Sequence, residues 1–157
     1  AHATATLSMR GIRLDPAVVL RRERRSGGAE DTPVDDPAPR HVTPQNPANW
    51  QKVVQSMVDV VHGTRGTARH IAEGSSYRIA GKTGTAQVFT VAQDEEYDEG
   101  GLDKKLRDHA LFVAYAPIEN PQIAIAVVVE NGGHGGSTAA PIARTVMDAY
   151  LLRDEKS

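Results

Sequence analysis

The sequence predicts a mixed α/β fold in which an antiparallel sheet is covered by helices. Three observations favour this class: two stretches with apolar residues at helical spacing, three short runs typical of strands, and a tight turn between the last two runs. A tight turn joins antiparallel neighbours, so the last two strands are expected to form a hairpin. The expected order along the chain is helix, long insert, helix, three strands and helix.

The first half of the chain contains two predicted helices separated by a polar insert. Ala1–Arg10 is rich in alanine and is expected to form a helix that ends at Gly11. Arg21–Pro47 combines an arginine cluster with acidic residues and five prolines, which favours a solvated loop over a patch that binds lipid or nucleic acid. Asn49–His62 is the clearest helix, and Asn49 is expected to cap it. Its apolar residues at helical spacing are Trp50, Val53, Val54, Met57, Val58 and Val61.

A glycine-rich segment, Gly63–Ala68, separates this helix from the first strand. It lacks the Gly-Lys-Ser/Thr ending of a phosphate-binding loop, so a turn is favoured, followed by a helical turn near Ala68–Ala72. Tyr77–Val91 is the first predicted strand. The next segment, Gln93–Asp108, is polar, and its acids suggest calcium ligands or glycosidase carboxylates. Because they follow no calcium-loop spacing, a solvated insertion is favoured.

The last third of the chain predicts two strands and a helix. His109–Tyr115 and Ile123–Val129 are the strands of the hairpin, and the nearly continuous apolar run of the second predicts a central strand buried on both faces. Ser137 is expected to cap a final helix that runs to about Leu152. Two glycines follow His134, as in the oxyanion loop of lipases, but the chain has no Gly-x-Ser-x-Gly, so His134 is interpreted as a loop residue.

Composition limits the functions that this chain can perform. It has 157 residues, of which 4% are aromatic and 24% charged, so its core must be mainly aliphatic. A net charge of -2 argues against a general affinity for nucleic acid. The chain has no cysteine, which excludes disulfides, zinc–thiolate sites and thiol catalysis, and no cofactor or metal is expected. No apolar run reaches the roughly 18–20 residues that span a bilayer.

The most informative segment is Lys82-Thr83-Gly84-Thr85, within the first predicted strand. Because side chains alternate along a strand, Thr83 and Thr85 are expected on one face and Lys82 on the other. Gly84 leaves room for a ligand to approach the backbone closely. An edge strand of this kind can pair with an extended peptide and hold its carboxylate.

Lys-Thr-Gly is one of the three signatures of the penicillin-binding proteins and serine β-lactamases. In its context here, the chain resembles the C-terminal part of a class B penicillin-binding protein of the elongation type. The segments that carry the resemblance are Arg78–Gln87, Leu106–His109, Phe112–Pro117, Asn120–Gln122 and Val127–Gly133. The resemblance implies a penicillin-binding, serine β-lactamase-like transpeptidase fold, with the active site between the sheet's edge strand and a helical subdomain. Residues 1–157 would be the C-terminal portion of one transpeptidase domain, with mobile inserts at 21–47 and 93–108.

The same resemblance implies a peptidoglycan D,D-transpeptidase that cross-links stem peptides through a serine acyl-enzyme and is acylated by β-lactams. Catalytic roles would fall to Lys82, as a positive charge beside the nucleophile, and to Thr85, whose N–H would form half of the oxyanion hole. Thr83, Gly84, Thr85 and Gly81 would bind the substrate or the β-lactam. A serine β-lactamase or a non-catalytic penicillin-sensing module of the same fold stays open as an alternative.

Two signatures of the family, Ser-x-x-Lys and Ser-x-Asn, are absent from this chain. No serine is followed by a lysine three residues later. The nucleophile is therefore expected on an upstream fragment of the same domain, which would be a partner of this chain. The other implied partners are peptidoglycan stem peptides, β-lactam antibiotics and a membrane glycan polymerase of the elongation machinery. The whole protein would lie at the periplasmic face of the bacterial inner membrane, anchored by an upstream transmembrane helix.

Overall fold

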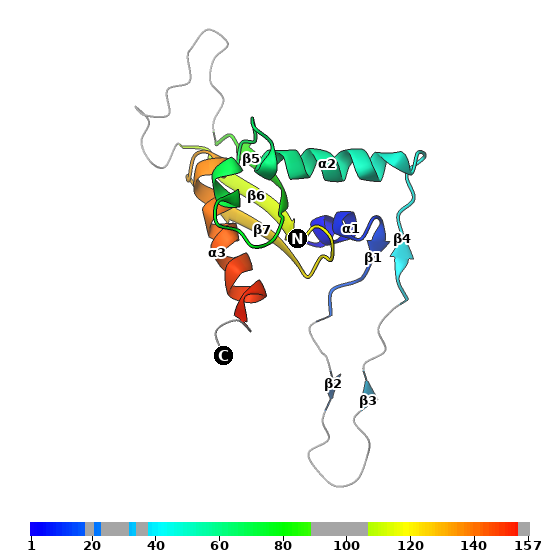
Figure 1. Cartoon of the computed structure of the whole chain (residues 1–157). Coiled ribbons are helices and arrows are strands. Elements are labelled where there is room, and N and C mark those ends of the chain that lie inside the picture. Colours follow the sequence, from blue (N-terminus) through cyan, green and yellow to red (C-terminus); the bar gives the residue numbers. More distant parts are fainter. Residues whose placement is uncertain (18–20, 23–31, 34–37, 89–106, 154–157) are drawn as a thin grey trace.

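The computed structural model describes residues 1–17, 21–22, 32–33, 38–88 and 107–153 (Figure 1). Large parts of the predicted inserts, 21–47 and 93–108, lie outside these residues. The first helix, α1 (His2–Ser8), ends as predicted, with Gly11 in the left-handed region at φ 98° and its N–H bonded to the Thr6 carbonyl. Two short antiparallel strand pairs follow. They are β1 (Ile12–Arg13) with β4 (Arg40–His41), and β2 (Arg21–Arg22) with β3 (Thr32–Pro33).

The main sheet has the strand order β5-β6-β7, and both pairs are antiparallel, which confirms the predicted hairpin. Its strands are β5 (Ala80–Ala86), β6 (His109–Ala116) and β7 (Ile123–Val129). The prediction that Ile123–Val129 is a central strand is wrong for the described residues, because β6 lies in the middle and Val128 on β7 is 61% exposed. A continuous apolar run indicates that a strand suits burial on both faces, but it does not identify the strand's neighbours.

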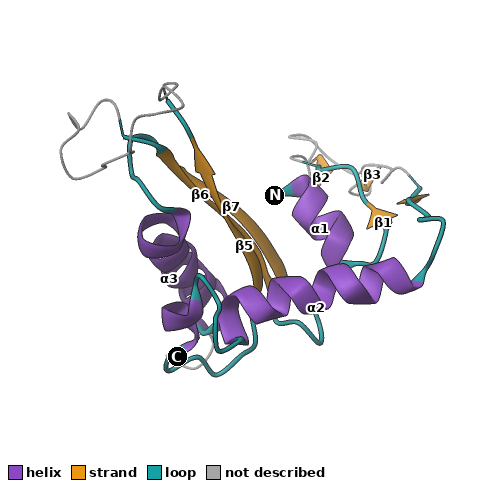
Figure 2. Cartoon of the chain, turned by 90° about the horizontal axis from the view of Figure 1, so that it is seen from above, coloured by secondary structure: helices purple, strands orange, loops and turns teal. Residues whose placement is uncertain are grey.

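Helices lie on both sides of this sheet. Figure 2 shows α3 (Ala140–Leu151) on one side, α1 on the other, and α2 (Ala48–His62) across one end of the strands. Two shorter elements join the α3 side: η1 (Arg69–Ala72) and the π-helical turn η4 (Gly135–Ala139). Within the described ranges, no helix combines the length and apolar character that crossing a membrane requires.

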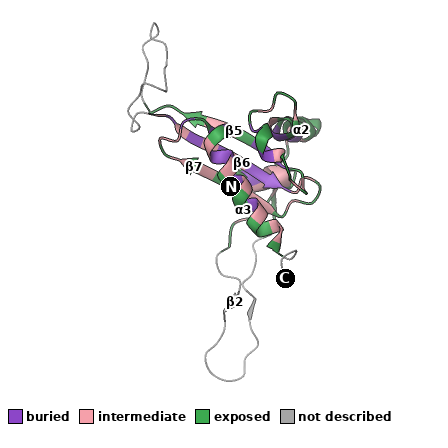
Figure 3. Ribbon diagram, turned by 60° about the vertical axis from the view of Figure 1, so that its left-hand side comes forward, coloured by how far each residue is buried: buried purple, intermediate pink, exposed green. Residues whose placement is uncertain are grey.

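Two hydrophobic cores form, one on each face of the sheet. In Figure 3 the buried residues concentrate on the sheet and on the inward sides of the helices. The larger core consists of Val61, Ala68, Ile71, Ile79, Ala110, Phe112, Ala114, Ala116, Ala139, Ala140, Ala143 and Met147. The smaller core consists of Val54, Met57, Val58, Ala80 and Tyr115. Since α2 supplies Val61 to the first and Val58 to the second, this one helix is anchored in both.

Two predicted helix caps are wrong. The helix α2 begins at Ala48, so Pro47 takes the N-cap position and Asn49 lies inside the first turn. The Ala48 N–H donates to the side-chain oxygen of Asn46 at 2.9 Å. The last helical segment begins at Gly135, ahead of Ser137, whose hydroxyl donates to the His134 carbonyl and does not accept from the helix. Both errors arise because several residues near a helix start can cap it, and only the backbone path selects one.

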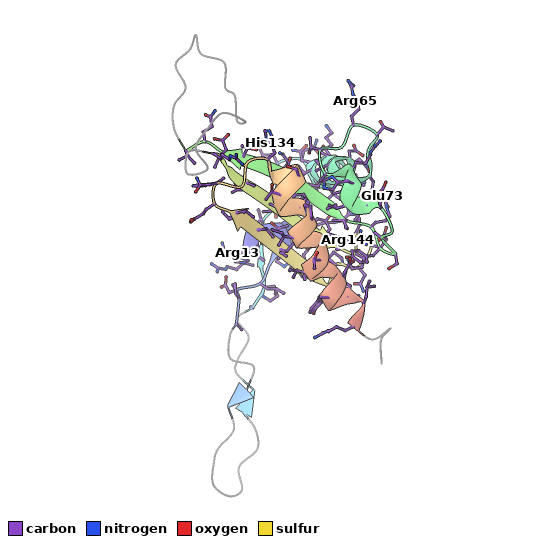
Figure 4. All side chains as sticks on the ribbon, turned by 90° about the vertical axis from the view of Figure 1, so that its left-hand side faces the viewer. Arg13, Arg65, Glu73, His134 and Arg144 are labelled. Carbon is purple, nitrogen blue, oxygen red and sulfur yellow. The ribbon has the colours of Figure 1, made fainter. Side chains whose placement is uncertain are left out.

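A cluster around Arg144 on α3 ties the helix to the segment that leads into β5. Its Nε donates to both carboxylate oxygens of Asp148 at 2.8 and 2.9 Å, and its Nη1 donates to the carbonyls of Ile71 and Glu73. Figure 4 shows Arg144 and Glu73 on adjoining elements. The Tyr77 hydroxyl also donates to Asp148, and the guanidinium lies 5.7 Å from the Tyr77 ring centre. Burial, followed by the Asp148 carboxylate, raises the pKa of Tyr77 well above its ordinary value.

Candidate active site

The strand β5 carries different functional groups on its two faces. Among the described strands it pairs only with β6. Thr83 lies opposite Phe112 and Thr85 opposite Ala110, and both partners belong to the larger core, so both threonines are on the α3 side. Lys82 lies on the opposite face. The alternation predicted from the sequence is confirmed, and β5 stands at an edge of the described sheet.

Lys82 lies along an apolar groove of about 530 Å³ beside α2. The apolar side chains that line it are Leu7 from α1, Val53, Met57 and Val60 from α2, and Val113 from β6. The ammonium donates a hydrogen bond to the carbonyl oxygen of Thr83. Lysine commonly lays its apolar stem on such a surface and keeps its charged end at the rim. The positive charge is therefore held at the edge of β5, on the α2 side.

The main chain of β5 presents polar groups at the same edge. The nitrogen and oxygen of Gly84 and the oxygen of Leu111 all lie within 3.0 Å of one point, the place that a Cβ on Gly135 would occupy. Gly84 therefore turns its N–H and C=O toward β6. Alternate residues of a strand direct these groups to opposite edges, so Thr83 and Thr85 direct theirs away from β6. The lysine contact agrees, since it ends on a carbonyl at this outer edge. The Thr85 N–H thus points outward from this edge of the described sheet.

A second threonine holds the hydroxyl of Thr83. The Oγ1 atoms of Thr83 and Thr67 are 3.0 Å apart, although the residues are 16 positions apart in the chain. Thr67 belongs to the loop between α2 and η1, and its neighbour Arg65 extends outward from that loop in Figure 4. Thr85, two residues beyond Thr83, is exposed. An ammonium on one side, hydroxyls on the other and an outward N–H between them can together bind a carboxylate and an adjacent carbonyl.

Glycines allow the loop before α3 to lie directly on β5. A Cβ on Gly135 would come within 2.1 Å of the Leu111 oxygen and 2.5 Å of the Gly84 oxygen. A Cβ on Gly136 would come within 2.3 Å of the Thr67 oxygen. Gly81 has a different neighbour, because the Phe112 ring would lie 2.6 Å from its Cβ. The space at Gly81 is therefore filled by the core, and its predicted contact with a ligand stays a prediction.

A histidine ties the end of α2 to the start of β5. The N–H of Ile79 donates to Nε2 of His62 at 3.0 Å. Burial lowers the pKa of His62 below its ordinary value, and the nearby Arg78 guanidinium lowers it further. The neutral ring is the form that can accept this hydrogen bond. The contact fixes the residue that precedes β5.

The structure brings together Lys82, Thr83, Gly84 and Thr85, as predicted, at one edge of the sheet. Sequence reasoning missed Thr67 and the contacts of Gly135 and Gly136. Clustered glycines signal close backbone approach, but nothing in the sequence names the approaching segment. His134, interpreted from the sequence as a loop residue, is exposed in the loop ahead of η4 (Figure 4). His109 accepts a hydrogen bond from the Asn131 N–H at 2.9 Å.

The side chains also limit the chemistry of the site. In the part of the chain that the structure describes, no group of three or more histidine or acidic residues is placed to hold a metal ion. The groups at the edge of β5 are an ammonium, hydroxyls and peptide groups. They suit recognition of an acyl group next to a carboxylate.

The family model for the penicillin-binding protein transpeptidase domain matches residues 1–148. The chain belongs to this family. The family and fold predictions are thereby confirmed, including the antiparallel sheet covered by helices. The expected division into one domain with inserts at 21–47 and 93–108 stays a prediction, and so do the roles of the individual site residues.

Several transpeptidase relatives resemble this chain. It is 47% identical over 126 residues to peptidoglycan D,D-transpeptidase MrdA of Haemophilus influenzae, covering 79% of this chain and 19% of that protein. It is 43% identical to Pseudomonas aeruginosa PBP2 in complex with WCK 5153, with a TM-score of 0.68 over 95% of this chain and 28% of that one. The chain therefore spans about a fifth of the length of the H. influenzae relative.

Two further solved structures of penicillin-binding proteins are informative, because one contains a bound penicillin and the other a protein partner. The penicillin G acyl-enzyme complex of penicillin-binding protein A from Mycobacterium tuberculosis is 28% identical, with a TM-score of 0.63 over 96% of this chain and 30% of that one. The complex between PBP2 and MreC from Helicobacter pylori is 30% identical, with a TM-score of 0.54 over 68% of this chain and 18% of that one.

Proposed function

We propose that the protein containing this chain is a peptidoglycan D,D-transpeptidase that works through a serine acyl-enzyme and is acylated by β-lactams. The observation that carries the proposal is the outer edge of β5, where the Lys82 ammonium and the Thr83 hydroxyl flank outward main-chain groups. Relatives named as D,D-transpeptidases support it, as does the penicillin acyl-enzyme of a similar protein.

The proposed chemistry uses these groups in one reaction. A serine oxygen attacks the carbonyl carbon of the penultimate D-alanine, the bond to the terminal D-alanine nitrogen breaks, and that nitrogen leaves as an amine after gaining a proton. The outward N–H of Thr85 stabilises the negative oxygen of the intermediate. Thr83 and Thr85 hold the terminal carboxylate, and Lys82 supplies positive charge beside the nucleophile and takes part in proton transfer. An amine of a second stem peptide then attacks the ester and regenerates the serine.

The missing nucleophile must reach the Lys82 side of β5. The upstream segment with Ser-x-x-Lys and Ser-x-Asn is expected to pack over the apolar groove beside α2, which Lys82 also lines, and so to place its serine near the ammonium. Val53 lines this groove and is 41% exposed, so such a segment would bury its apolar side chain. The upstream fragment is thus the partner that completes the proposed site.

Labelling with a fluorescent penicillin tests the proposal. In the complete transpeptidase domain, Lys82→Ala should slow labelling by roughly a hundredfold or more, because a positioned proton-transfer group contributes at least that factor. Arg153→Ala is the control, since Arg153 is an exposed cation after the end of α3 whose contact within the described residues is with the Tyr150 ring. Its labelling should match that of the unaltered domain.

Unchanged labelling of the Lys82→Ala domain would contradict the site assignment. The rate at which the label is released then separates the alternatives within the family. Rapid release would indicate a β-lactamase, whereas a stable ester together with cross-linking of stem peptides supports the transpeptidase. A stable ester without any turnover of stem peptides would indicate a sensing module.

We also propose that the whole protein acts at the periplasmic face of the inner membrane, beside a membrane glycan polymerase of the elongation machinery. The cross-linked substrate supports this location, because stem peptides are joined outside the cytoplasm. The H. pylori relative forms a complex with MreC, which makes an MreC-like protein a further candidate partner. Digestion by protease added to spheroplasts would support the location, and resistance in intact spheroplasts together with digestion after lysis would contradict it.

A further inference from the structure

The turn between α2 and η1 ends beside the edge strand of the proposed active site. Three hydrogen bonds close this turn: Gly66 N–H to the Gly63 carbonyl at 3.0 Å, Ala68 N–H to the Val60 carbonyl at 3.0 Å, and Arg69 N–H to the Gly66 carbonyl at 3.2 Å. A Cβ on Gly66 would lie only 2.4 Å from the Val60 oxygen. The turn is therefore packed tightly against the end of α2.

Thr67 is fixed on its other side as well. Its carbonyl oxygen lies against Gly136, and a Cβ on Gly136 would come within 2.3 Å of that oxygen. The following residue, Ala68, is fully buried in the larger core. Thr67 itself is exposed, so a rigid backbone presents its hydroxyl outward. This hydroxyl lies 3.0 Å from the Thr83 hydroxyl.

We propose that Thr67 is a positioning residue that orients the Thr83 hydroxyl toward the carboxylate of the substrate or the β-lactam. This inference rests on the proposed function and adds a residue to its site. A carboxylate only accepts hydrogen bonds, and each hydroxyl has one hydrogen to give. When Thr83 donates to the carboxylate, its oxygen must accept from Thr67. The two hydroxyls then form a chain that runs from Thr67 through Thr83 to the ligand.

Two features favour this chain over a chance surface contact. The Thr83 side chain also lies beside the loop that packs on Thr67, since its Cγ2 is 3.6 Å from the position that a Cβ on Gly136 would occupy. Successive hydrogen bonds polarise one another, so donation by Thr67 makes the Thr83 hydroxyl a better donor. Loss of one neutral hydrogen bond is expected to slow acylation by roughly three- to tenfold.

The test measures the second-order rate constant for acylation of the complete domain by benzylpenicillin. Thr67→Val keeps the shape of the side chain but removes the hydroxyl, and should slow acylation roughly three- to tenfold. Thr67→Ser restores a hydroxyl and should restore the rate. Thr64→Val is the matched control, because Thr64 is an exposed threonine of the same turn, and its rate should be unchanged. Thermal unfolding of each variant shows whether the fold is retained.

A double-mutant cycle tests whether Thr67 acts through Thr83. In a Thr83→Val background, the additional change Thr67→Val should have no further effect on the rate. An equal slowing in both backgrounds would overturn the inference, and so would failure of Thr67→Ser to recover the rate.

The cycle also separates this inference from the proposed function. If the unaltered domain is acylated and Thr83→Val slows it, while Thr67→Val does not, only the positioning role falls. If the unaltered domain is not acylated by benzylpenicillin, the proposed function falls and the positioning role with it.

Discussion

Replacing Gly135 with alanine should move the edge strand and slow acylation. The backbone at Gly135 lies outside the left-handed region, so alanine is compatible with its dihedral angles. Any effect must therefore come from the added methyl group, which would lie 2.1 Å from the Leu111 oxygen and 2.5 Å from the Gly84 oxygen. These are main-chain atoms, and they cannot rotate away as a flexible side chain would.

The size of the effect follows from these distances. Non-bonded heavy atoms rest at roughly 3.5 Å from a carbon, so the loop and the strand would have to separate by about 1 Å. A displacement of about 1 Å at a reacting centre costs roughly a hundredfold in rate. The overpacked contact should also lower the free energy of unfolding by about 1–3 kcal/mol.

The assay is stopped-flow or gel-based acylation by a fluorescent penicillin, with urea unfolding of the same preparations. Gly74→Ala is the matched control: Gly74 has φ +62°, and no atom lies within 4 Å of its Cβ position. It should lose about 1 kcal/mol from backbone strain and keep its acylation rate. An unchanged acylation rate for Gly135→Ala would refute the view that this glycine sets the position of β5.

Two further predictions concern the elements that hold β5 in place. Arg144→Met should lower the free energy of unfolding by about 3 kcal/mol, because it leaves two carbonyls and the Asp148 carboxylate without this largely buried donor. Arg153→Met is the control: among the described residues it removes a ring contact on Tyr150, and it should cost less than about 1 kcal/mol. Equal losses of the two variants in urea unfolding would contradict this account. Because the pKa of His62 is lower in the folded chain, the unfolded chain takes up a proton at a higher pH than the folded chain does. The contribution of neutral His62 to stability is therefore complete above the unfolded pKa of roughly 6.5, and it is lost as pH falls through the lower folded pKa. When the pH is lowered from 7.5 to 5.5, the urea midpoint of unfolding should therefore decrease more in the unaltered domain than in His62→Gln. Identical pH profiles of the two would exclude His62 as the cause.

Local pattern was sufficient for the three α-helices, the three strands of the main sheet and the two faces of β5, but it did not predict the strand pairs β1–β4 and β2–β3. Helical spacing located α2, and strand alternation placed Lys82 and Thr83 on opposite faces, because both patterns depend only on residues near one another in the chain. The contact of Thr83 with Thr67 and that of Gly135 with Leu111 join segments from separate parts of the chain. No periodicity encodes such a pair, so the sequence could not predict them.

The caps and the strand order show a second limit. Asn46 and Asn49 carry the same side chain, and the path of the chain before α2 places the Asn46 oxygen, not that of Asn49, on the Ala48 N–H. The apolar run Ile123–Val129 has the composition of an interior strand, yet its position in the sheet depends on which other segments pair with it. The composition of a strand indicates the environment that suits it, but its position in the sheet is set by the pairing of all the strands.

The two cores support different groups of the proposed site. The ammonium of Lys82 rests on the groove beside the smaller core, whereas the Thr83 hydroxyl depends on a turn and a glycine loop packed on the larger one. Substitutions in the smaller core would therefore act first on the groove that carries the Lys82 side chain, and substitutions in the larger core on the turn and loop beside the Thr83 hydroxyl. Affinity for a drug carboxylate and reactivity of the nucleophile would then be open to separate adjustment during evolution, from positions that never touch the ligand.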